Sequence, residues 1–179
     1  MNDVFVERMV KKKFDGKDAL ITAAVIVGIL VLSFIGFIVG FFLFRFPTLS
    51  LLITAGAVFG GYKLIGSRML EFEYSLTNGF VTVDKILNRA SRKRLTSFEC
   101  ETCEDIGNYL ENEERLKNRS FDTRVFATRD SSRQGSWYMI VHGKKTGKTL
   151  VVFDPDEDLL EAIKKFIPRQ LKFEKFGRN

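Results

Sequence analysis

The sequence predicts a membrane protein in which a hairpin of two α-helices precedes a single α+β domain. Two observations carry this prediction. Residues 19–44 contain no charged side chain, and a second uncharged run, residues 46–62, follows after Arg45. Beyond residue 66 charged residues become frequent and apolar residues alternate with polar ones. The chain therefore divides into a part suited to a lipid bilayer and a part suited to water.

The first uncharged run is long enough to cross a membrane. As a helix it would extend roughly 39 Å at about 1.5 Å per residue, whereas a bilayer core needs only about 20 apolar residues. Its Leu, Ile, Val and Phe side chains favour insertion by at most about 5 to 11 kcal/mol. A buried core helix is the alternative, but a domain of this size could not cover a helix that is apolar all round.

The second run is less apolar and contains Pro47, three glycines and several hydroxyl residues. We expect it to begin with Pro47 in its first turn and to return across the bilayer as far as about Gly66. The predicted hairpin covers residues 19–66, with helices over 19–44 and 46–66. A re-entrant or surface segment is the alternative for this second run.

Small residues are spaced four apart in both runs, as in closely packed transmembrane helices. The predicted helix-packing residues are Gly36, Gly40, Gly56 and Gly60. An antiparallel pair turning at Arg45 would place Gly36 and Gly40 opposite Thr54 and Ser50, so packing within the hairpin is the favoured interpretation. Oligomerisation is the alternative.

Basic residues near the ends of the runs predict the orientation. Five Lys or Arg residues precede Ala19, only Arg45 lies between the runs, and Lys63 and Arg68 follow. The positive-inside rule then places the N-terminus in the cytoplasm, and two crossings return the domain to the same side. We expect a multi-pass protein of the cell membrane with both termini cytoplasmic. No small-x-small site follows the first run, so it does not resemble a cleaved signal peptide.

The part beyond the hairpin reads mainly as β-structure. Residues 69–77 alternate and end at Asn78-Gly79, the strongest two-residue hairpin signal, before a second strand over 80–87. Residues 105–118 are polar and predict a loop with one short helical piece. Further strands are predicted around 95–100, 121–128, 137–142 and 149–153.

The apolar period changes near the C-terminus. An amphipathic helix is predicted there, with Asp154 as N-cap, Pro155 in its first turn and Pro168 at its end. Its apolar stripe consists of Leu159, Leu160, Ile163, Phe166 and Ile167. About six antiparallel strands followed by one such helix is the order of a pleckstrin-homology (PH)-like barrel. The predicted domain covers 67–168, with a cytoplasmic segment over 1–18 and a basic tail over 169–179.

Several segments also resemble known proteins. Residues 74–79, then Val81, Val83 and Ile86, and then Arg92-Lys93-Arg94, resemble the opening of bacterial PH-like domains that follow a transmembrane hairpin. Residues 1–17 and 153–164 are similar to those of an uncharacterised family of small bacterial two-span proteins. The resemblance implies an antiparallel PH-like β-barrel capped by a C-terminal amphipathic helix. It implies no activity and no site residues.

No catalytic, cofactor or metal site is predicted, so an enzyme is not expected. Cys100 and Cys103 have the spacing of redox and zinc sites, but their acidic neighbours disfavour the thiolate, and His142 is the only histidine. We expect two reduced thiols, with redox and metal roles as alternatives. Residues 143–149 lack the G-x4-G-K-[ST] frame of a phosphate loop.

A basic cluster near residue 90 is the strongest candidate for a contact site. Its members are Lys85, Arg89, Arg92, Lys93 and Arg94. Their K-x6-R-x-R spacing is similar to the phosphoinositide pattern of eukaryotic PH domains, but that pattern lies between the first two strands and this one between the second and third. Each basic residue near an anionic leaflet contributes about 1 kcal/mol. We expect the cluster to tune membrane contact rather than to form a stoichiometric ligand pocket, with a solvated turn as the alternative.

These features predict a membrane-anchored, non-enzymatic PH-like module that binds a protein partner or the anionic inner leaflet. The alternative is a structural subunit of a membrane assembly, a homo-oligomer formed through the hairpin. No nucleic-acid partner and no cofactor are expected.

Overall fold

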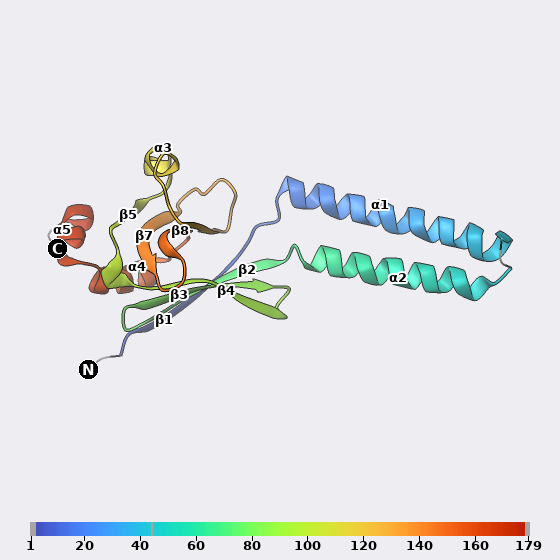
Figure 1. The fold of residues 1–179 in the computed structure, drawn as a ribbon, viewed down its shortest axis with the longest axis horizontal. Coiled ribbons are helices and arrows are strands. Elements are labelled where there is room, and N and C mark those ends of the chain that lie inside the picture. Colours follow the sequence, from blue (N-terminus) through green and yellow to red (C-terminus); the bar gives the residue numbers. More distant parts are fainter. Residues whose placement is uncertain (1–2, 44, 178–179) are drawn as a thin grey trace. The chain divides into compact units, whose positions relative to one another are not determined.

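A computed structural model describes residues 3–43 and 45–177, which belong to two compact units (Figure 1). Residues 14–69 form a helical unit. The residues before 14 and those from 70 onward form a second, β-rich unit, called the sheet domain below. The sheet domain is therefore assembled from two stretches of chain that the helical unit separates in sequence.

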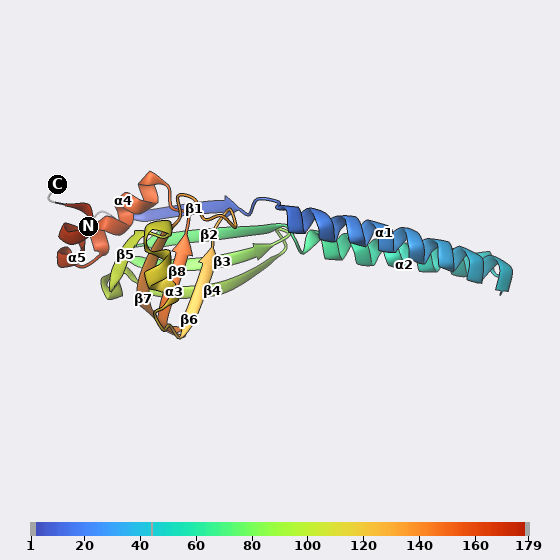
Figure 2. The same cartoon turned by 90° about the horizontal axis from the view of Figure 1, so that it is seen from above.

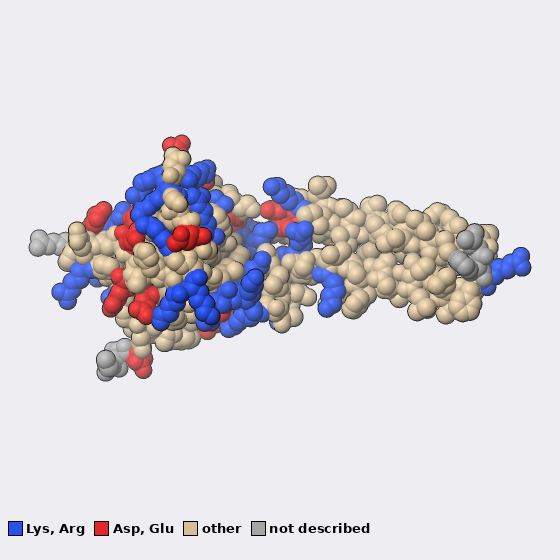
Figure 3. Space-filling model, viewed as in Figure 1, with Lys and Arg blue, Asp and Glu red and all other residues tan. Residues whose placement is uncertain are grey.

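The helical unit contains α1 (Gly16–Ile38), a π-helical turn η1 (Val39–Leu43) and α2 (Pro47–Gly66). Two helical stretches, Gly16–Phe42 and Thr48–Gly66, are long and apolar enough to cross a membrane by length and composition. The face of these helices seen in Figure 3 is almost free of charged side chains over most of its length. Phe44, the predicted last residue of the first span, lies outside the described residues.

The four predicted packing glycines fall into two groups. A Cβ atom on Gly36 would lie 2.8 Å from Cγ2 of Ile53, and one on Gly40 would lie 2.9 Å from the backbone nitrogen of Ser50. Gly36 in α1 and Gly40 in η1 therefore let the first helical stretch approach α2 closely. A Cβ atom on Gly56 would meet nothing within 4 Å, and the same holds for Gly60.

The sheet domain contains two four-stranded sheets whose strands cross steeply (Figure 2). The first sheet is antiparallel in the order β1-β2-β3-β4, with β1 (Phe5–Lys11), β2 (Leu70–Thr77), β3 (Phe80–Leu87) and β4 (Ser91–Glu99). The second has the order β5-β7-β8-β6, with β5 (Asp105–Asn108), β7 (Trp137–Gly143), β8 (Gly147–Phe153) and β6 (Thr123–Ala127).

Strand β1 is the main element that the sequence did not predict. It precedes α1, yet it pairs with β2, which follows α2, from Phe5 opposite Thr77 to Lys11 opposite Glu71. Its Val10 is only 2 % exposed and belongs to the main core. Residues 1–18 looked like a segment outside the domain because four charged residues interrupt the apolar alternation between Phe5 and Lys13.

Strand β6 departs from the predicted antiparallel arrangement. It runs parallel to β8, from Thr123 opposite Thr149 to Ala127 opposite Phe153. The β7–β8 hairpin is the reason, because its second arm lies between β6 and β7 and so separates two strands that are consecutive in sequence.

The main core fills the space between the inner faces of the two sheets. Helix α4 (Glu157–Phe166) adds Leu159 and Ile163 to this core from the predicted apolar stripe. Its N-cap is Asp156, which accepts a hydrogen bond from the Leu159 N–H, and not the predicted Asp154. Asp154 instead accepts hydrogen bonds from the Arg129 N–H and the Ser136 hydroxyl, so it holds the 128–136 loop.

Two segments predicted as loop or tail are ordered. Residues 105–118 contain β5, the 3-10 turn η3 (Leu110–Asn112) and α3 (Glu113–Lys117), and they cover a second, smaller core on the outer face of the second sheet. The predicted basic tail forms helix α5 (Arg169–Phe176), which lies beside α4 at one end of the domain (Figures 1 and 2). Its Phe176 stacks on Trp137 with ring centroids 5.7 Å apart.

Candidate membrane-contact site

The predicted basic cluster lies at the end of the first sheet where β3 turns into β4. Leu87, the last residue of β3, is opposite Leu70, the first residue of β2. Lys11, the last residue of β1, is opposite Glu71. Both places where the chain passes between the sheet domain and the apolar helices are therefore at the end of the sheet that carries the basic turn.

The five predicted contact residues do not form one surface. Arg92 and Arg94 are opposite Ile86 and Asp84, on the face of the sheet that points away from the core. Lys93 is opposite Lys85 on the other face, because successive strand residues point to opposite sides. The sequence could not separate the two groups before the register was known.

Each of the three arginines in the cluster faces a carboxylate. Arg92 Nη2 lies 2.5 Å from Glu73 Oε2, and Arg94 makes a two-pronged contact with Asp84, with N···O distances of 2.9 and 3.2 Å. Arg89 Nε lies 3.6 Å from Glu71 Oε1. The carboxylates are largely buried, whereas more than half of each arginine side chain is exposed, so the surface is cationic although every arginine is paired.

Opposing effects act on the pKa of Glu73, the carboxylate that pairs with Arg92. Its burial raises the pKa, the positive charge of Arg92 lowers it, and the neighbouring carboxylates of Glu7 and Asp84 raise it again. The net result is a pKa above the ordinary value. Glu73 and Asp84 are directly opposite each other on β2 and β3, so removal of the arginines would leave two adjacent carboxylates without compensation.

An open groove of about 430 Å³ lies on the same face of the sheet, beside the turn. Its lining residues are Met9, Lys11, Glu71, Ile86, Arg89, Ala90, Ser91 and Arg92. Met9, Lys11 and Glu71 were missed because they come from β1 and from the start of β2. No local signal could have placed the segment before α1 next to the residue 90 turn.

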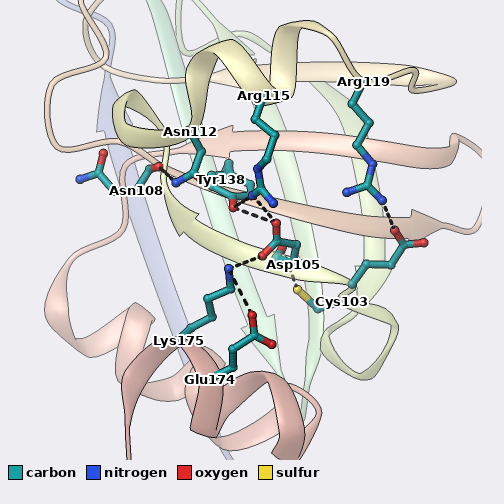
Figure 4. Close-up of polar contacts among 10 residues, drawn as sticks. Cys103, Asp105, Asn108, Asn112, Arg115, Arg119, Tyr138, Glu174 and Lys175 are labelled. Carbon is teal, nitrogen blue, oxygen red and sulfur yellow. Dashed lines mark hydrogen bonds and ion pairs between the residues drawn. The ribbon is translucent and has the colours of Figure 1, made fainter.

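A second polar cluster surrounds Asp105 in β5 (Figure 4). Arg115 Nη2 lies 2.5 Å from Oδ2, the Tyr138 hydroxyl donates to the same oxygen at 2.9 Å, and Lys175 Nζ lies 2.9 Å from Oδ1. Burial would raise the pKa of Asp105, but the hydrogen bonds from Lys175, Tyr138 and Arg115 outweigh it and lower the pKa. The cluster joins β5, α3, β7 and α5, and we assign it a structural role.

The cysteine pair lies inside the core and not in an open site. Cys100 and Cys103 are free and buried, and burial raises the pKa of each thiol to about 12. Cys103 donates to the Asp105 carbonyl oxygen at 3.3 Å. Such thiols are poor nucleophiles at neutral pH. Over the residues that the structure describes, no group of three His, Cys, Asp or Glu side chains could hold a metal ion.

The comparison with known families is decisive for the fold. The family described as Bacterial PH-like domain (DUF6106) matches residues 2–173. The chain belongs to this family. The match covers β1, both apolar helices and nearly all of the PH-like domain, as the sheet domain is called from here on. No curated protein and no solved structure matches the chain. PH-like domains are generally non-catalytic, and the family description names no ligand.

Proposed function

We propose that the protein is a membrane-anchored, non-enzymatic module whose PH-like domain contacts the anionic inner leaflet through the arginine-rich end of its first sheet. One observation carries the proposal. Strand β1 precedes the two apolar helices and β2 follows them, yet the two strands are neighbours in one sheet.

This pairing supports two spans rather than one. Paired strands are on the same side of a membrane, so the chain between Lys11 and Leu70 crosses the bilayer an even number of times or not at all. Two stretches in that interval are long and apolar enough to cross. With five basic residues before Ala19 and one between the runs, the positive-inside rule favours the cytoplasmic side for both termini.

The charge at this end of the sheet supports contact with an anionic surface. The exposed cations are Lys11, Arg89, Arg92 and Arg94, and the carboxylates that partner them are largely buried. The ion pairs reduce the attraction below about 1 kcal/mol per basic residue. A hairpin anchor makes even a weak attraction sufficient, because it holds the domain at the membrane.

Cysteine labelling in intact cells tests the topology. We expect Ser131→Cys to be protected from a membrane-impermeant maleimide and Thr48→Cys to react. The native Cys100 and Cys103 give little background because they are buried with raised pKa values. Permeabilised cells, in which both introduced thiols should react, are the control. Labelling of Ser131→Cys in intact cells would contradict the two-span arrangement.

Hydrogen exchange tests leaflet contact with the full chain in lipid nanodiscs. We expect the amides of residues 87–91 to exchange several-fold more slowly in discs with 30 % phosphatidylglycerol than in pure phosphatidylcholine discs. The difference should shrink as salt rises from about 0.05 to 0.5 M, because screening shortens the range of electrostatic attraction. Equal exchange in both lipids would refute leaflet contact and leave a protein partner as the candidate ligand.

A second function, a structural subunit that assembles through its helices, is favoured by one observation. Gly56 and Gly60, with Gly28 of α1, line an open groove of about 460 Å³ between α1 and α2. Small residues at an open helix surface suit contact with another helix. The mass of the chain in nanodiscs separates the proposals, because only the second function requires more than one copy.

A further inference from the structure

We propose that the groove beside the β3–β4 turn binds the headgroup of one anionic phospholipid molecule. The inference rests on the proposed function and adds to it a stoichiometric site. It departs from our sequence-based expectation of diffuse attraction, because a groove formed by β1, β2 and the turn is visible only in the tertiary structure.

The lining of the groove suits an amphiphile. Met9 and Ile86 provide apolar surface, and Met9 is 47 % exposed on a sheet face that also carries the polar residues Glu7, Ser75 and Thr82. Lys11, Arg89 and Arg92 provide cationic groups close to this apolar surface. A glycerol backbone with the first acyl carbons fits the apolar part, and a phosphate fits the cationic part.

Two of the three cations of the groove, Lys11 and Arg89, retain capacity for an anion. Lys11 Nζ and Arg89 Nε share one oxygen, Glu71 Oε1, at 4.0 and 3.6 Å, which are both longer than a hydrogen bond. Arg92 in the groove and Arg94 outside it differ, since Arg92 Nη2 lies 2.5 Å from Glu73 Oε2 and Arg94 forms a close two-pronged pair with Asp84. Three cations and one carboxylate line the groove, so a phosphate there would gain charge-assisted hydrogen bonds.

The backbone of the turn supports a specific role for Arg89. Asn88 and Arg89 have φ values of 47° and 54°. A turn with two such residues usually has Asn followed by Gly, and Arg is unfavourable where Gly is preferred. An unfavourable conformation retained at an exposed turn motivates a functional hypothesis, and here it accompanies an Arg89 side chain that reaches Glu71 across the groove.

The position of the groove selects a phospholipid over a soluble phosphate. The groove lies at the end of the sheet where Lys11 and Leu70 lead into the apolar helices, so a hairpin inserted in the bilayer, as proposed above, would tether the groove to the membrane. Phospholipid headgroups are concentrated there, and a site tethered to them needs only modest intrinsic affinity.

Native mass spectrometry of the full-length chain, released from detergent with phosphatidylglycerol, tests this site. We expect the wild-type chain to retain one phosphatidylglycerol molecule that Arg89→Asn does not retain. The fraction of chains with this lipid bound should be at least tenfold lower in Arg89→Asn. Asn tolerates the positive φ, so the turn is preserved. Lys93→Asn is the matched control, because it removes one charge from the same hairpin at a residue that does not line the groove. It should retain the lipid.

The outcomes separate this inference from the proposed function. Two results together support the lipid site. The bound phosphatidylglycerol is lost selectively in Arg89→Asn, and the lipid bound to the wild-type chain stays in place in excess glycerol 3-phosphate. Equal losses in both variants, or no lipid that depends on Arg89, would overturn the site while salt-dependent protection of residues 87–91 still supported leaflet contact. Displacement by glycerol 3-phosphate at matched concentration would overturn the assignment to a phospholipid and indicate a soluble phosphate ligand.

Discussion

Val10→Asn is expected to destabilise the PH-like domain by about 3 to 4 kcal/mol. Val10 is 2 % exposed in the core, so the substitution removes about 1.5 kcal/mol or more of apolar burial and places an amide without a partner there, at roughly 1 to 3 kcal/mol. The effect is informative because Val10 precedes α1, whereas almost all of the domain follows α2.

Unfolding of the full chain in detergent, followed by fluorescence of Trp137, measures this effect. Trp137 is the only tryptophan and stacks on Phe176, so its emission reports on the folded domain. With a urea dependence of about 1 to 3 kcal/mol per M, the midpoint should fall by about 1 to 4 M. Met9→Asn is the matched control on the exposed face of β1 and should change stability by about 0.5 kcal/mol. Equal effects of the two substitutions would refute the pairing of β1 in the sheet.

Asp105→Asn is expected to destabilise the domain by about 2 to 3 kcal/mol at pH 7. The carboxylate accepts from Arg115, Tyr138 and Lys175, and removal of its charge leaves two cations without their anion. The effect should be smaller than for a fully buried pair because about half of the Arg115 side chain is exposed. Glu161→Gln, at an exposed pair with Lys164, is the control and should leave the urea midpoint almost unchanged, because solvent screens this pair.

The difference in stability between the wild type and Asp105→Asn should depend on pH with a defined sign. The pKa of Asp105 in the folded domain lies below the ordinary value of 3.8. Its contribution to stability is therefore complete above about pH 4 and is lost as the pH falls through the lower folded pKa. The difference between wild type and Asp105→Asn in the urea midpoint should be constant from pH 5 to 7 and should shrink below pH 4. A difference that persisted at pH 2 would show that the ionised carboxylate is not responsible.

The elements predicted most accurately depend on local sequence. Asn78-Gly79 joins two strands within one residue of the predicted bounds, because both positions have positive φ values that these residues tolerate. The apolar stripe around Leu159 and Ile163 identified α4 because helical periodicity is a property of neighbouring residues. The N-cap was misplaced by two residues, since Asp154 and Asp156 are equally suitable locally and only the 128–136 loop uses the former.

The surroundings of the candidate contact site were predicted less completely, for a different reason. Arg89, Arg92 and Arg94 were recognisable as a basic turn, but their carboxylate partners Glu71, Glu73 and Asp84 come from β2 and β3 and depend on strand register. A shift of one residue would place each arginine on the other face of the sheet. Register is set by the whole sheet, so neither the ion pairs nor the groove could be derived from the residues near 90 alone.

The sequence by itself determined two apolar runs long enough for a bilayer and the charge bias around them. It also determined an α+β domain without a recognisable catalytic set. These features can be derived from sequence because length, hydropathy and periodicity depend only on residues that are neighbours along the chain. Only the tertiary structure decided that β1 joins β2 across the helices, that β6 runs parallel to β8 and that the basic turn stands beside a groove. These features depend on contacts between distant segments, and their stability comes from burial that no single segment provides.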